Sequence, residues 1–418
     1  MLWENKLILN DTAFKHATGA LLAAAVAGGD VPGVVAAVTN ADETIYAGAA
    51  GVRALNPSGQ SGNQSAHGAA MTQDTVVWLA SMTKPIVGAA AMQLVEQGRL
   101  QLDEPLAKVI PELGNVKVLT GWDAQGGITT RAPKTPITLR HLLTHTSGFV
   151  YDTWNPDMAR FHKVNSIPRA GSGLDRALRL PLAFDPGERW EYGINIEWTG
   201  KVIEAVSGKR LGHYLIDHIT GPLGMHSTGF KITPDMRARL AKVHQRGEDG
   251  TLAVTDFEIN QTPEFEPGGG GLYSTSSDYQ RFMRMILNGG RGQDTGGVAG
   301  RGDQVLRPET IALMSQNAMG NLRVRMLPTQ SPALSRDAEF FPGLHKSWGL
   351  SFMINEETAP TGRSPGSLAW AGLANTFFWI DPAKKIGGVI LMQVLPFVDE
   401  KALNVFTAFE NGVYAALA

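Results

Sequence analysis

The segment Ser81-Met82-Thr83-Lys84-Pro85 decides how the fold of this chain is interpreted. A serine and a lysine three residues apart share one face of a helix. The helix should begin at about Ser81, because Pro85 fits only the first turn, where backbone N–H groups have no intrahelical partner. The Ser81 hydroxyl would then lie at the positive end of a helix, one turn from an ammonium group, and both favour negative charge on its oxygen. The segment therefore predicts a serine nucleophile that needs no adjacent histidine.

Taken alone, this spacing also suits an ordinary capped helix that carries a surface lysine. Ser81 is, however, the only serine of the chain with a lysine three places later. Further residues are needed to separate the two interpretations.

The composition sets limits on fold and function. The chain has 418 residues, of which 43% are hydrophobic and 18% charged, with a formal net charge of -2 and no cysteine. This predicts a globular protein with ample core, in two or three units or in one large domain with an insertion. Nothing indicates binding to nucleic acid or to an anionic membrane. Disulfides, thiolate metal sites and thiolate nucleophiles are excluded.

The first six residues lack the basic start and the long apolar run of a signal peptide, and no apolar run is long enough to span a membrane. We therefore expect a cytoplasmic protein that acts on a small molecule. The oligomeric state is left open.

Periodicity predicts strands at both ends of the chain and helices between them. Expected helices cover residues 11–26, 81–98, 196–206, 277–287 (with a capping box of Ser277 and Gln280) and 399–417, and expected strands cover 34–39, 44–52, 348–354, 367–372, 376–380 and 387–394. This order predicts an α+β fold in which one antiparallel sheet is built from both ends. Residues 1–104 and 268–418 would form a discontinuous α/β sheet domain, and 105–267 a mainly helical domain, with the active site between them.

A lysine-assisted serine needs a further group that passes the proton to the leaving atom. Tyr192 is the candidate, because it follows a Pro-Gly turn and precedes a helix, a loop position suited to catalysis. A nearby ammonium should lower its phenol pKa toward neutrality. A half-buried tyrosine with a satisfied hydroxyl is the simpler alternative.

Other motifs carry less weight. Ser364 lies in a G-x-S-x-G pattern, but the oxyanion hole of that motif needs the N–H of the next residue, and Pro365 has none. His141 and His145 have a metal-ligand spacing without the glutamate of H-E-x-x-H, so we interpret both as structural. Residues 268–271 lack the ending of a phosphate-binding loop and indicate a bend. No cofactor and no metal are expected.

The chain resembles the serine β-lactamase-like superfamily, which includes class C β-lactamases, D-Ala-D-Ala peptidases and family VIII carboxylesterases, the last being most similar. The resemblance rests on five segments in the family's order, which span most of the chain: Ser81-Met82-Thr83-Lys84, residues 141–148, residues 184–192, residues 269–275 and Trp370-Ala371-Gly372. It implies an antiparallel sheet flanked by helices, with an inserted mainly helical domain.

The resemblance also implies the roles of individual residues. Ser81 would be the acylated nucleophile, and Lys84 with Tyr192 would form its base system. Trp370, Ala371 and Gly372 would lie on an edge of the sheet beside the serine and line the pocket. The backbone N–H groups of Ser81 and Leu373 would form the oxyanion hole.

Two departures from the β-lactamase pattern indicate the type of substrate. Ile194 stands where those enzymes carry the asparagine that binds an amide, with Asn195 one place later, and Trp370 replaces a lysine that holds a carboxylate. Both changes favour apolar esters. Tyr151 and Trp154, with Trp122, Phe340 and Phe341, are candidate pocket walls.

The sequence thus predicts a serine carboxylesterase that hydrolyses short-chain acyl esters through an acyl-enzyme on Ser81. A β-lactamase or D-amino-acid peptidase, an acyltransferase of the same superfamily, and a non-catalytic penicillin-binding-like sensor are the alternatives.

Overall fold

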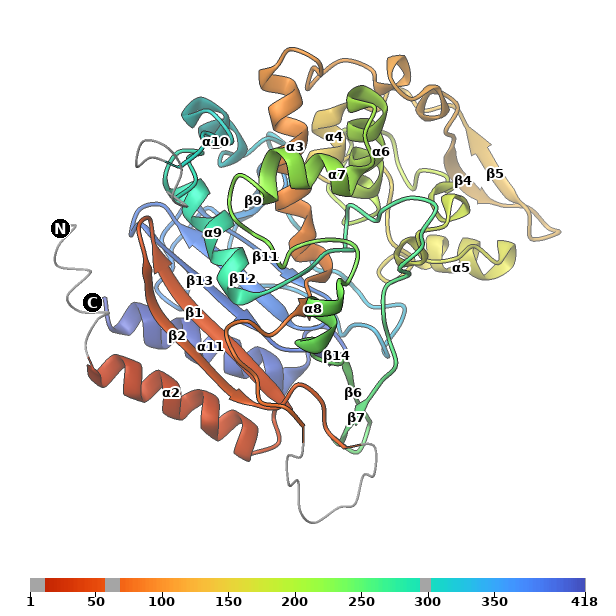
Figure 1. Ribbon diagram of the computed structural model, residues 1–418. Coiled ribbons are helices and arrows are strands. Elements are labelled where there is room, and N and C mark those ends of the chain that lie inside the picture. The colour runs from red at the N-terminus through yellow and green to blue at the C-terminus, as the bar shows by residue number, and fades with distance from the viewer. Residues whose placement is uncertain (1–11, 57–67, 294–301, 418) are drawn as a thin grey trace.

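The computed structural model describes residues 12–56, 68–293 and 302–417. Its centre is a seven-stranded antiparallel sheet of order β2-β1-β13-β12-β11-β10-β9 (Figure 1). The strands are β1 (Gly33–Asn40), β2 (Thr44–Gly51), β9 (Lys346–Trp348), β10 (Met353–Asn355), β11 (Ser367–Gly372), β12 (Thr376–Asp381) and β13 (Ile386–Leu391). Val35 of β1 pairs with Leu391 of β13, so the two ends of the chain meet inside one sheet. The predicted α+β class is confirmed.

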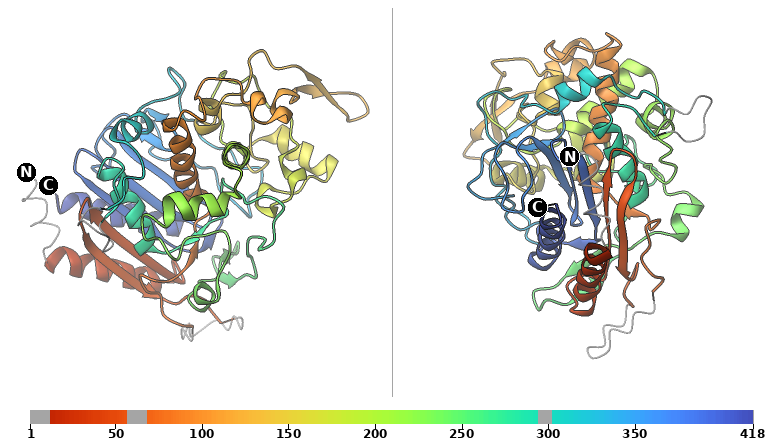
Figure 2. Two further views of the ribbon diagram at one scale, coloured as in Figure 1. Left: turned by 45° about the horizontal axis from the view of Figure 1, so that its top comes forward. Right: turned by 90° about the vertical axis from the view of Figure 1, so that its left-hand side faces the viewer.

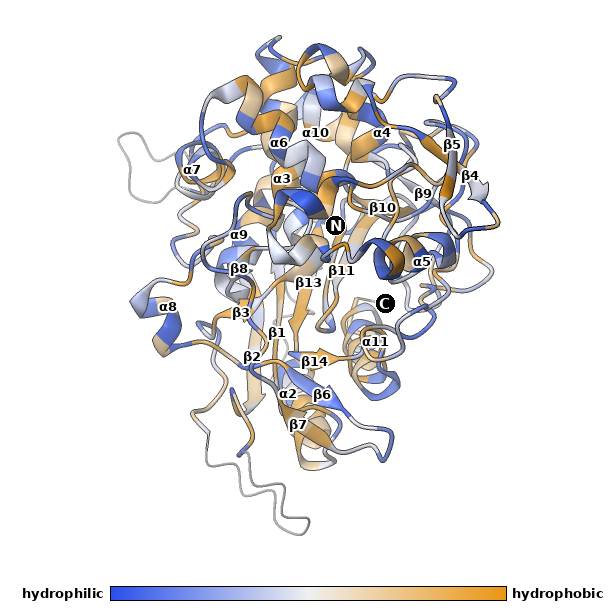
Figure 3. Ribbon diagram, turned by 90° about the vertical axis from the view of Figure 1, so that its right-hand side faces the viewer, coloured by the Kyte–Doolittle hydropathy of each residue, from blue (hydrophilic) through white to orange (hydrophobic). Residues whose placement is uncertain are grey.

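Helices cover both faces of this sheet because its side chains alternate between the faces. On β12, Phe377 stacks on Phe406 of α11 (Glu400–Ala415), with ring centroids 4.4 Å apart. The next residue, Phe378, contacts Tyr279 of α9 (Ser276–Leu287) on the opposite face, at 5.1 Å. The helix α2 (Thr12–Ala27) packs beside α11, as Figure 2 shows. Apolar residues gather along the strands and the covering helices in Figure 3.

The remaining elements come mostly from the middle of the chain. They are α3 (Thr83–Glu96), α4 (Leu139–Leu143), α5 (Pro156–Asn165), α6 (Asn195–Ser207), α7 (Leu211–Leu215), α8 (Pro234–Ala238), α10 (Pro308–Met314), β3 (Val77–Trp78), β4 (Val118–Trp122), β5 (Ile128–Arg131), β6 (His244–Arg246), β7 (Leu252–Val254), β8 (Tyr273–Ser274) and β14 (Val394–Leu395). Single turns are η1 (Ala80–Met82), η2 (Leu106–Lys108), η3 (Pro111–Gly114), η4 (Ala170–Ser172), η5 (Asp175–Leu178) and η6 (Ile216–Thr220). The β4–β5 hairpin projects from the body of the molecule (Figure 1).

Some predicted elements differ from the structure. The expected strand over 348–354 is two strands, because the Gly349 N–H donates to Phe352 O and closes a tight turn between β9 and β10. The predicted capping box at Ser277 is wrong. The hydroxyl of Thr275 caps α9 instead, by accepting the Asp278 N–H. The expected strand over 387–394 ends as β13, and β14 pairs with β6 in a separate sheet.

One hydrophobic core runs through the sheet, its helices and the middle segment. The division of the chain at residues 104/105 and 267/268 therefore stays a prediction. Within the described part of the chain, no helix combines the length and the apolar character needed to cross a bilayer. The first six residues, on which the signal-peptide prediction rests, lie outside that part.

Candidate active site

Ser81 lies in the single turn η1, which leads directly into α3. The predicted helix start is confirmed, with Pro85 in the first turn of α3. Ala80, just before the serine, has a φ of 47°, a conformation that costs an alanine about 1–2 kcal/mol. Gly372 of β11 lets the sheet approach this turn, since a Cβ there would lie 2.2 Å from Leu79 O. The serine is thus held in a strained, tightly packed position.

The Lys84 amine points back at the serine from the next turn. Its Nζ donates hydrogen bonds to Ser81 Oγ at 3.1 Å, to Gly269 O at 2.6 Å and to Tyr151 OH at 3.2 Å. Burial lowers the pKa of Lys84 to about 8, although the Glu197 carboxylate opposes this shift. The neutral amine, which can accept a proton, is therefore accessible at mildly alkaline pH.

Tyr192 completes the Ser-Lys-Tyr cluster (Ser81, Lys84 and Tyr192). Its hydroxyl is hydrogen-bonded to the Ser81 side chain and accepts the Trp370 indole N–H at 2.9 Å. Lys84 Nζ lies 4.6 Å from the centre of its ring. The three residues that the sequence singled out for catalysis therefore lie together.

The predicted electrostatic state of Tyr192 is wrong. Burial raises the phenol pKa of Tyr192 above its usual value, and the Glu197 charge adds to this rise. Hydrogen bonds from Ser81 and Trp370 lower the pKa but do not offset burial. The sequence argument counted the nearby ammonium and left out desolvation, which dominates for a side chain that is 2% exposed. Tyr192 is a neutral phenol at physiological pH.

The segment Trp370-Ala371-Gly372 lies on a locally open edge of the sheet beside the serine, as predicted. Strands β10 and β9 lie beyond β11, but β10 pairs only with Ser367–Ala369, so the second half of β11 faces η1 directly. None of these three is among the described residues that line the cavity above Ser81, which corrects their predicted role as pocket lining, and the Trp370 indole instead donates to Tyr192. Leu373 does line the cavity, and its N–H has no hydrogen-bond partner among the described residues.

Ile194 and Asn195 both face away from the substrate space. Ile194 is 2% exposed and packs in the core, which corrects its expected role as a substrate contact. The Asn195 amide donates to Phe149 O and to His145 Nδ1, each at 3.0 Å, and its oxygen accepts the Ser147 hydroxyl. Asn195 is therefore fully engaged and leaves no amide for a substrate.

The two histidines of the predicted motif make structural contacts. His141 Nδ1 accepts the Thr138 N–H at 3.3 Å in the cap of α4. The ring of His145 packs on Tyr192, with ring centroids 4.6 Å apart. Among the described residues, no group of three or more His, Asp or Glu side chains is arranged to hold a metal ion.

A cavity of about 570 Å³ opens above Ser81. Its lining is largely apolar and comprises Trp78, Trp154, Leu174, Phe257, Ile259, Leu334 and Leu373, with Ser81, Tyr151, Arg169 and Glu197 among the polar members. Tyr151 and Trp154 thus lie where pocket walls were expected.

Trp122, Phe340 and Phe341 do not line this cavity, which corrects their prediction. Trp122 of β4 donates to Asp157 of α5, the Phe340 ring packs against Trp370, and the Arg363 guanidinium lies over the Phe341 ring. Each aromatic ring packs a loop onto the core, the simpler of the two explanations.

The sequence interpretation missed Glu197, five residues after Tyr192 in the first turn of α6. Its carboxylate accepts the Tyr151 hydroxyl at 3.0 Å and lines the cavity floor. An acidic residue in a first helical turn is common near the positive end of a helix, so the sequence offered no reason to expect it in the site.

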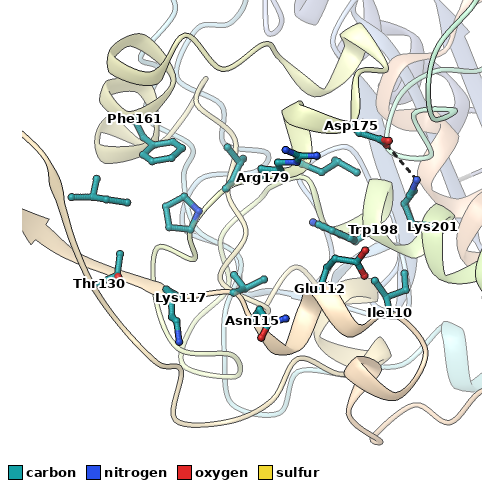
Figure 4. A pocket seen from close by; sticks show the side chains of 15 residues that line it. Ile110, Glu112, Asn115, Lys117, Thr130, Phe161, Asp175, Arg179, Trp198 and Lys201 are labelled. Atoms are coloured by element: carbon teal, nitrogen blue, oxygen red, sulfur yellow. Dashed lines mark hydrogen bonds and ion pairs between the residues drawn. The ribbon is translucent and has the colours of Figure 1, made fainter.

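A second cavity, of about 560 Å³, is also lined in part by α6 (Figure 4). The next residue of the helix, Trp198, lines it with Ile110 and Phe161, and Lys201 pairs with Asp175 at 3.3 Å at its rim. The described lining contains no member of the Ser-Lys-Tyr cluster.

Comparisons with known proteins show the family of this chain. The family model described as beta-lactamase matches residues 19–410. Monacolin J acid methylbutanoyltransferase of Aspergillus terreus is 32% identical over 354 residues, which cover 82% of this chain and 82% of that protein. A lovastatin esterase of Penicillium rubens is 30% identical over 405 residues, which cover 94% of this chain and 96% of that protein. The solved structure of simvastatin synthase of Aspergillus terreus has a TM-score of 0.81 at 28% identity, covering 97% of this chain and 99% of that one.

Proposed function

The chain belongs to the beta-lactamase family, and from this premise we propose that it is a serine acyltransferase. It would move a short acyl group from an ester donor to a bulky apolar alcohol through an acyl-enzyme on Ser81. The observation that carries this proposal is the size and character of the cavity. A short acyl chain fills only part of about 570 Å³, and the largely apolar lining favours a second apolar group over water.

The acylation step follows from the hydrogen bonds at Ser81. Its oxygen attacks the donor carbonyl carbon, and its proton passes to the neutral Lys84 amine, directly or through the Tyr192 hydroxyl. The N–H groups of Ser81 and Leu373 would bind the oxyanion. The tetrahedral intermediate then expels the donor alkoxide, which takes the proton and leaves as an alcohol.

The second step reverses these roles. The acceptor alcohol gives its proton to the Lys84–Tyr192 pair while the alcohol oxygen attacks the acyl carbon. The bond between Ser81 Oγ and the acyl carbon then breaks, and Ser81 Oγ takes a proton back from the pair. Water in the same place would hydrolyse the acyl-enzyme. Support for transfer comes from the similarity to a protein named as a methylbutanoyltransferase.

Hydrolysis of esters is the second candidate function. The observation that favours it is the similarity to a lovastatin esterase across 94% of this chain. β-Lactam turnover has less support, because Ile194 is buried, Trp370 supports Tyr192 and Asn195 is engaged by its neighbours.

A partition experiment separates transfer from hydrolysis. The enzyme is loaded with p-nitrophenyl butyrate, and the products are quantified with and without a bulky apolar alcohol such as menthol. We expect ester product to exceed free butyrate at saturating alcohol, and Ser81→Ala to form neither product. Butyrate as the main product with every bulky alcohol tried would instead assign the chain to the hydrolases.

A further inference from the structure

Glu197 is a buried acid beside the reacting groups that the proposed mechanism does not yet use. We infer that Glu197, acting through the Tyr151 hydroxyl, is a positioning residue that holds Lys84 and stabilises the ammonium formed when the lysine takes the Ser81 proton. This inference rests on the proposed function, since it concerns the activation of the same serine.

The geometry connects the four residues in one chain of hydrogen bonds. Lys84 Nζ donates to Ser81 Oγ at 3.1 Å and to Tyr151 OH at 3.2 Å. The Tyr151 hydroxyl in turn donates to Glu197 Oε1 at 3.0 Å. Burial and the Glu197 charge raise the pKa of Tyr151 well above its usual value, so the phenol remains a neutral donor. A change at the carboxylate therefore reaches the lysine through a single hydroxyl.

The other carboxylate oxygen shows that Glu197 is not held by a local ion pair. Oε2 is buried and has no hydrogen-bond partner among the described residues. Gly269 leaves room for it, since a Cβ there would lie 2.2 Å from Oε2, and the carbonyl of the same glycine accepts the Lys84 amine at 2.6 Å. Burial raises the pKa of the Glu197 carboxyl, and the positive charge of Lys84 opposes this rise in part, so each charge stabilises the other.

The groups around Lys84 leave Glu197 as the source of negative charge. Burial lowers the pKa of His145 well below its usual value, so this ring is neutral. The two phenols, Tyr151 and Tyr192, are neutral because burial raises their pKa. Of the described charged groups, Glu197 is the one that raises the pKa of Lys84 against the effect of burial. Its removal should make the ammonium less stable and shift the pH dependence of serine activation to lower pH.

The test measures activation of Ser81 without a turnover assay. A fluorophosphonate probe forms a bond between Ser81 Oγ and phosphorus, fluoride leaves, and the serine proton goes to the lysine. Its rate of labelling, followed by intact mass across neutral and alkaline pH, reports the protonation of Lys84. In Glu197→Gln we expect the plateau rate to fall at least about tenfold and the midpoint to move down by about one pH unit.

Two further variants control this result. Glu204→Gln removes the same charge from the same helix, at a carboxylate that accepts the Leu211 N–H, and should leave plateau and midpoint unchanged. Tyr151→Phe removes the hydroxyl but keeps the Glu197 charge, so the plateau should fall while the midpoint moves less than in Glu197→Gln. If thermal melting shows that Glu197→Gln does not fold, a lowered plateau in Tyr151→Phe with a midpoint near that of wild type supports the inference, and an unchanged plateau overturns it.

The outcomes separate the two proposals. Wild-type protein that is not labelled at Ser81 would overturn the proposed function. If wild type is labelled and folded Glu197→Gln keeps the wild-type pH midpoint, Glu197 has only a structural role. That result would overturn the present inference and leave the proposed function standing. In Tyr151→Phe, a midpoint shift as large as that of Glu197→Gln would also contradict it, because the hydroxyl would then account for the whole effect.

Discussion

At Ser81, backbone strain and hydrogen bonding act on one hydroxyl. Ala80 holds a left-handed conformation, with φ 47°, immediately before the serine, whose oxygen accepts the Lys84 amine and whose side chain is hydrogen-bonded to Tyr192. Strain of this kind persists where the surrounding packing enforces it, and it is typical of active sites. This combination distinguishes Ser81 from Ser364. The backbone N–H of Ser364 donates to the carboxylate of Asp381, at the end of β12.

Replacement of Ser81 by alanine should abolish the acyl-enzyme, because the other hydroxyl that accepts a hydrogen bond from Lys84, that of Tyr151, is a phenol that donates its proton to Glu197. The mass increment after incubation with p-nitrophenyl butyrate measures it. Ser364→Ala is the matched control and should retain most of the wild-type rate. Equal losses in both variants, with unchanged circular dichroism, would contradict the assignment of the nucleophile.

Tyr192→Phe keeps the ring and its packing but removes the transferable proton, and we expect kcat to fall at least about a hundredfold. The pH dependence should keep its midpoint. Burial raises the pKa of Tyr192, so the phenol does not titrate in the assay range, whereas burial lowers the pKa of Lys84 to about 8. The rate should therefore rise with pH as the lysine loses its proton, in wild type and variant alike.

A stopped-assay pH profile of kcat/KM for both proteins checks this expectation. A rate that falls as the lysine deprotonates would favour the opposite assignment, with a phenolate as base and an ammonium as its partner. Near-normal kcat in Tyr192→Phe would leave the proton transfer to Lys84 alone.

Sequence reasoning identified the Ser-Lys-Tyr cluster because its members belong to short motifs with a local mechanism. It missed Glu197 and reversed the pKa shift of Tyr192 for one physical reason. Both depend on burial and on contacts between distant segments, such as Gly269 against the Glu197 carboxylate. A motif specifies which side chains are present, but desolvation is a property of the packed molecule.

At the scale of elements, the approach of β11 to η1 determines where the serine lies. Gly372 makes this approach possible, since a Cβ would lie 2.2 Å from Leu79 O and 2.2 Å from Thr376 Oγ1. The Thr376 hydroxyl itself donates to Leu79 O at 3.2 Å. The glycine of the Trp370-Ala371-Gly372 motif is therefore needed for packing against the serine turn.

Gly372→Ala should displace β11 from η1, lower the free energy of unfolding by about 1–3 kcal/mol and reduce kcat/KM at least about tenfold.

Gly412→Ala in α11 is the control, because a Cβ there meets nothing within 4 Å. It should raise the free energy of unfolding by about 0.5–1 kcal/mol, as expected for glycine in a helix interior, and leave activity unchanged. Urea titration with parallel kinetics measures both, and a Gly372→Ala protein of wild-type activity would show that the close approach is dispensable.

Strands and long helices were predictable because their periodicity is a local property, as in the β1–β2 hairpin, β11 and α6. The elements that differ depend on distant partners. A short apolar run does not show where the chain turns or which strand it pairs with. The turn between β9 and β10 and the pairing of β14 with β6 were therefore not predictable from periodicity.

At the scale of the whole molecule, buried contacts tie the middle of the chain to both ends. Arg246 of β6 forms an ion pair of 2.6 Å with Asp399, the cap of α11, and also donates to Asp30 O. Its side chain is 8% exposed and that of Asp399 is 5% exposed. Such contacts join segments that the sequence assigned to different domains, so the domain boundaries stay a prediction. The cytoplasmic location also stays a prediction.

The cavity above Ser81 and the second cavity, each lined in part by α6, provide a test of the proposed acceptor. Leu174 lines the cavity above Ser81, whereas Ile128, which is 37% exposed, lines the second cavity. Leu174→Trp should narrow the space beside the acyl group, so kcat/KM for transfer to a bulky alcohol should fall about tenfold, while hydrolysis of a small ester changes little, because water needs no such space.

Ile128→Trp adds the same ring to the second cavity and should affect neither reaction, if that cavity takes no part in catalysis. The ratio of transfer to hydrolysis with p-nitrophenyl butyrate and menthol measures the effect in one assay, since both products come from the same acyl-enzyme. Equal loss of transfer and hydrolysis in Leu174→Trp would mean that the acyl group itself occupies the wall beside Leu174. An unchanged ratio in Leu174→Trp, with a lowered ratio in Ile128→Trp, would place the acceptor in the second cavity.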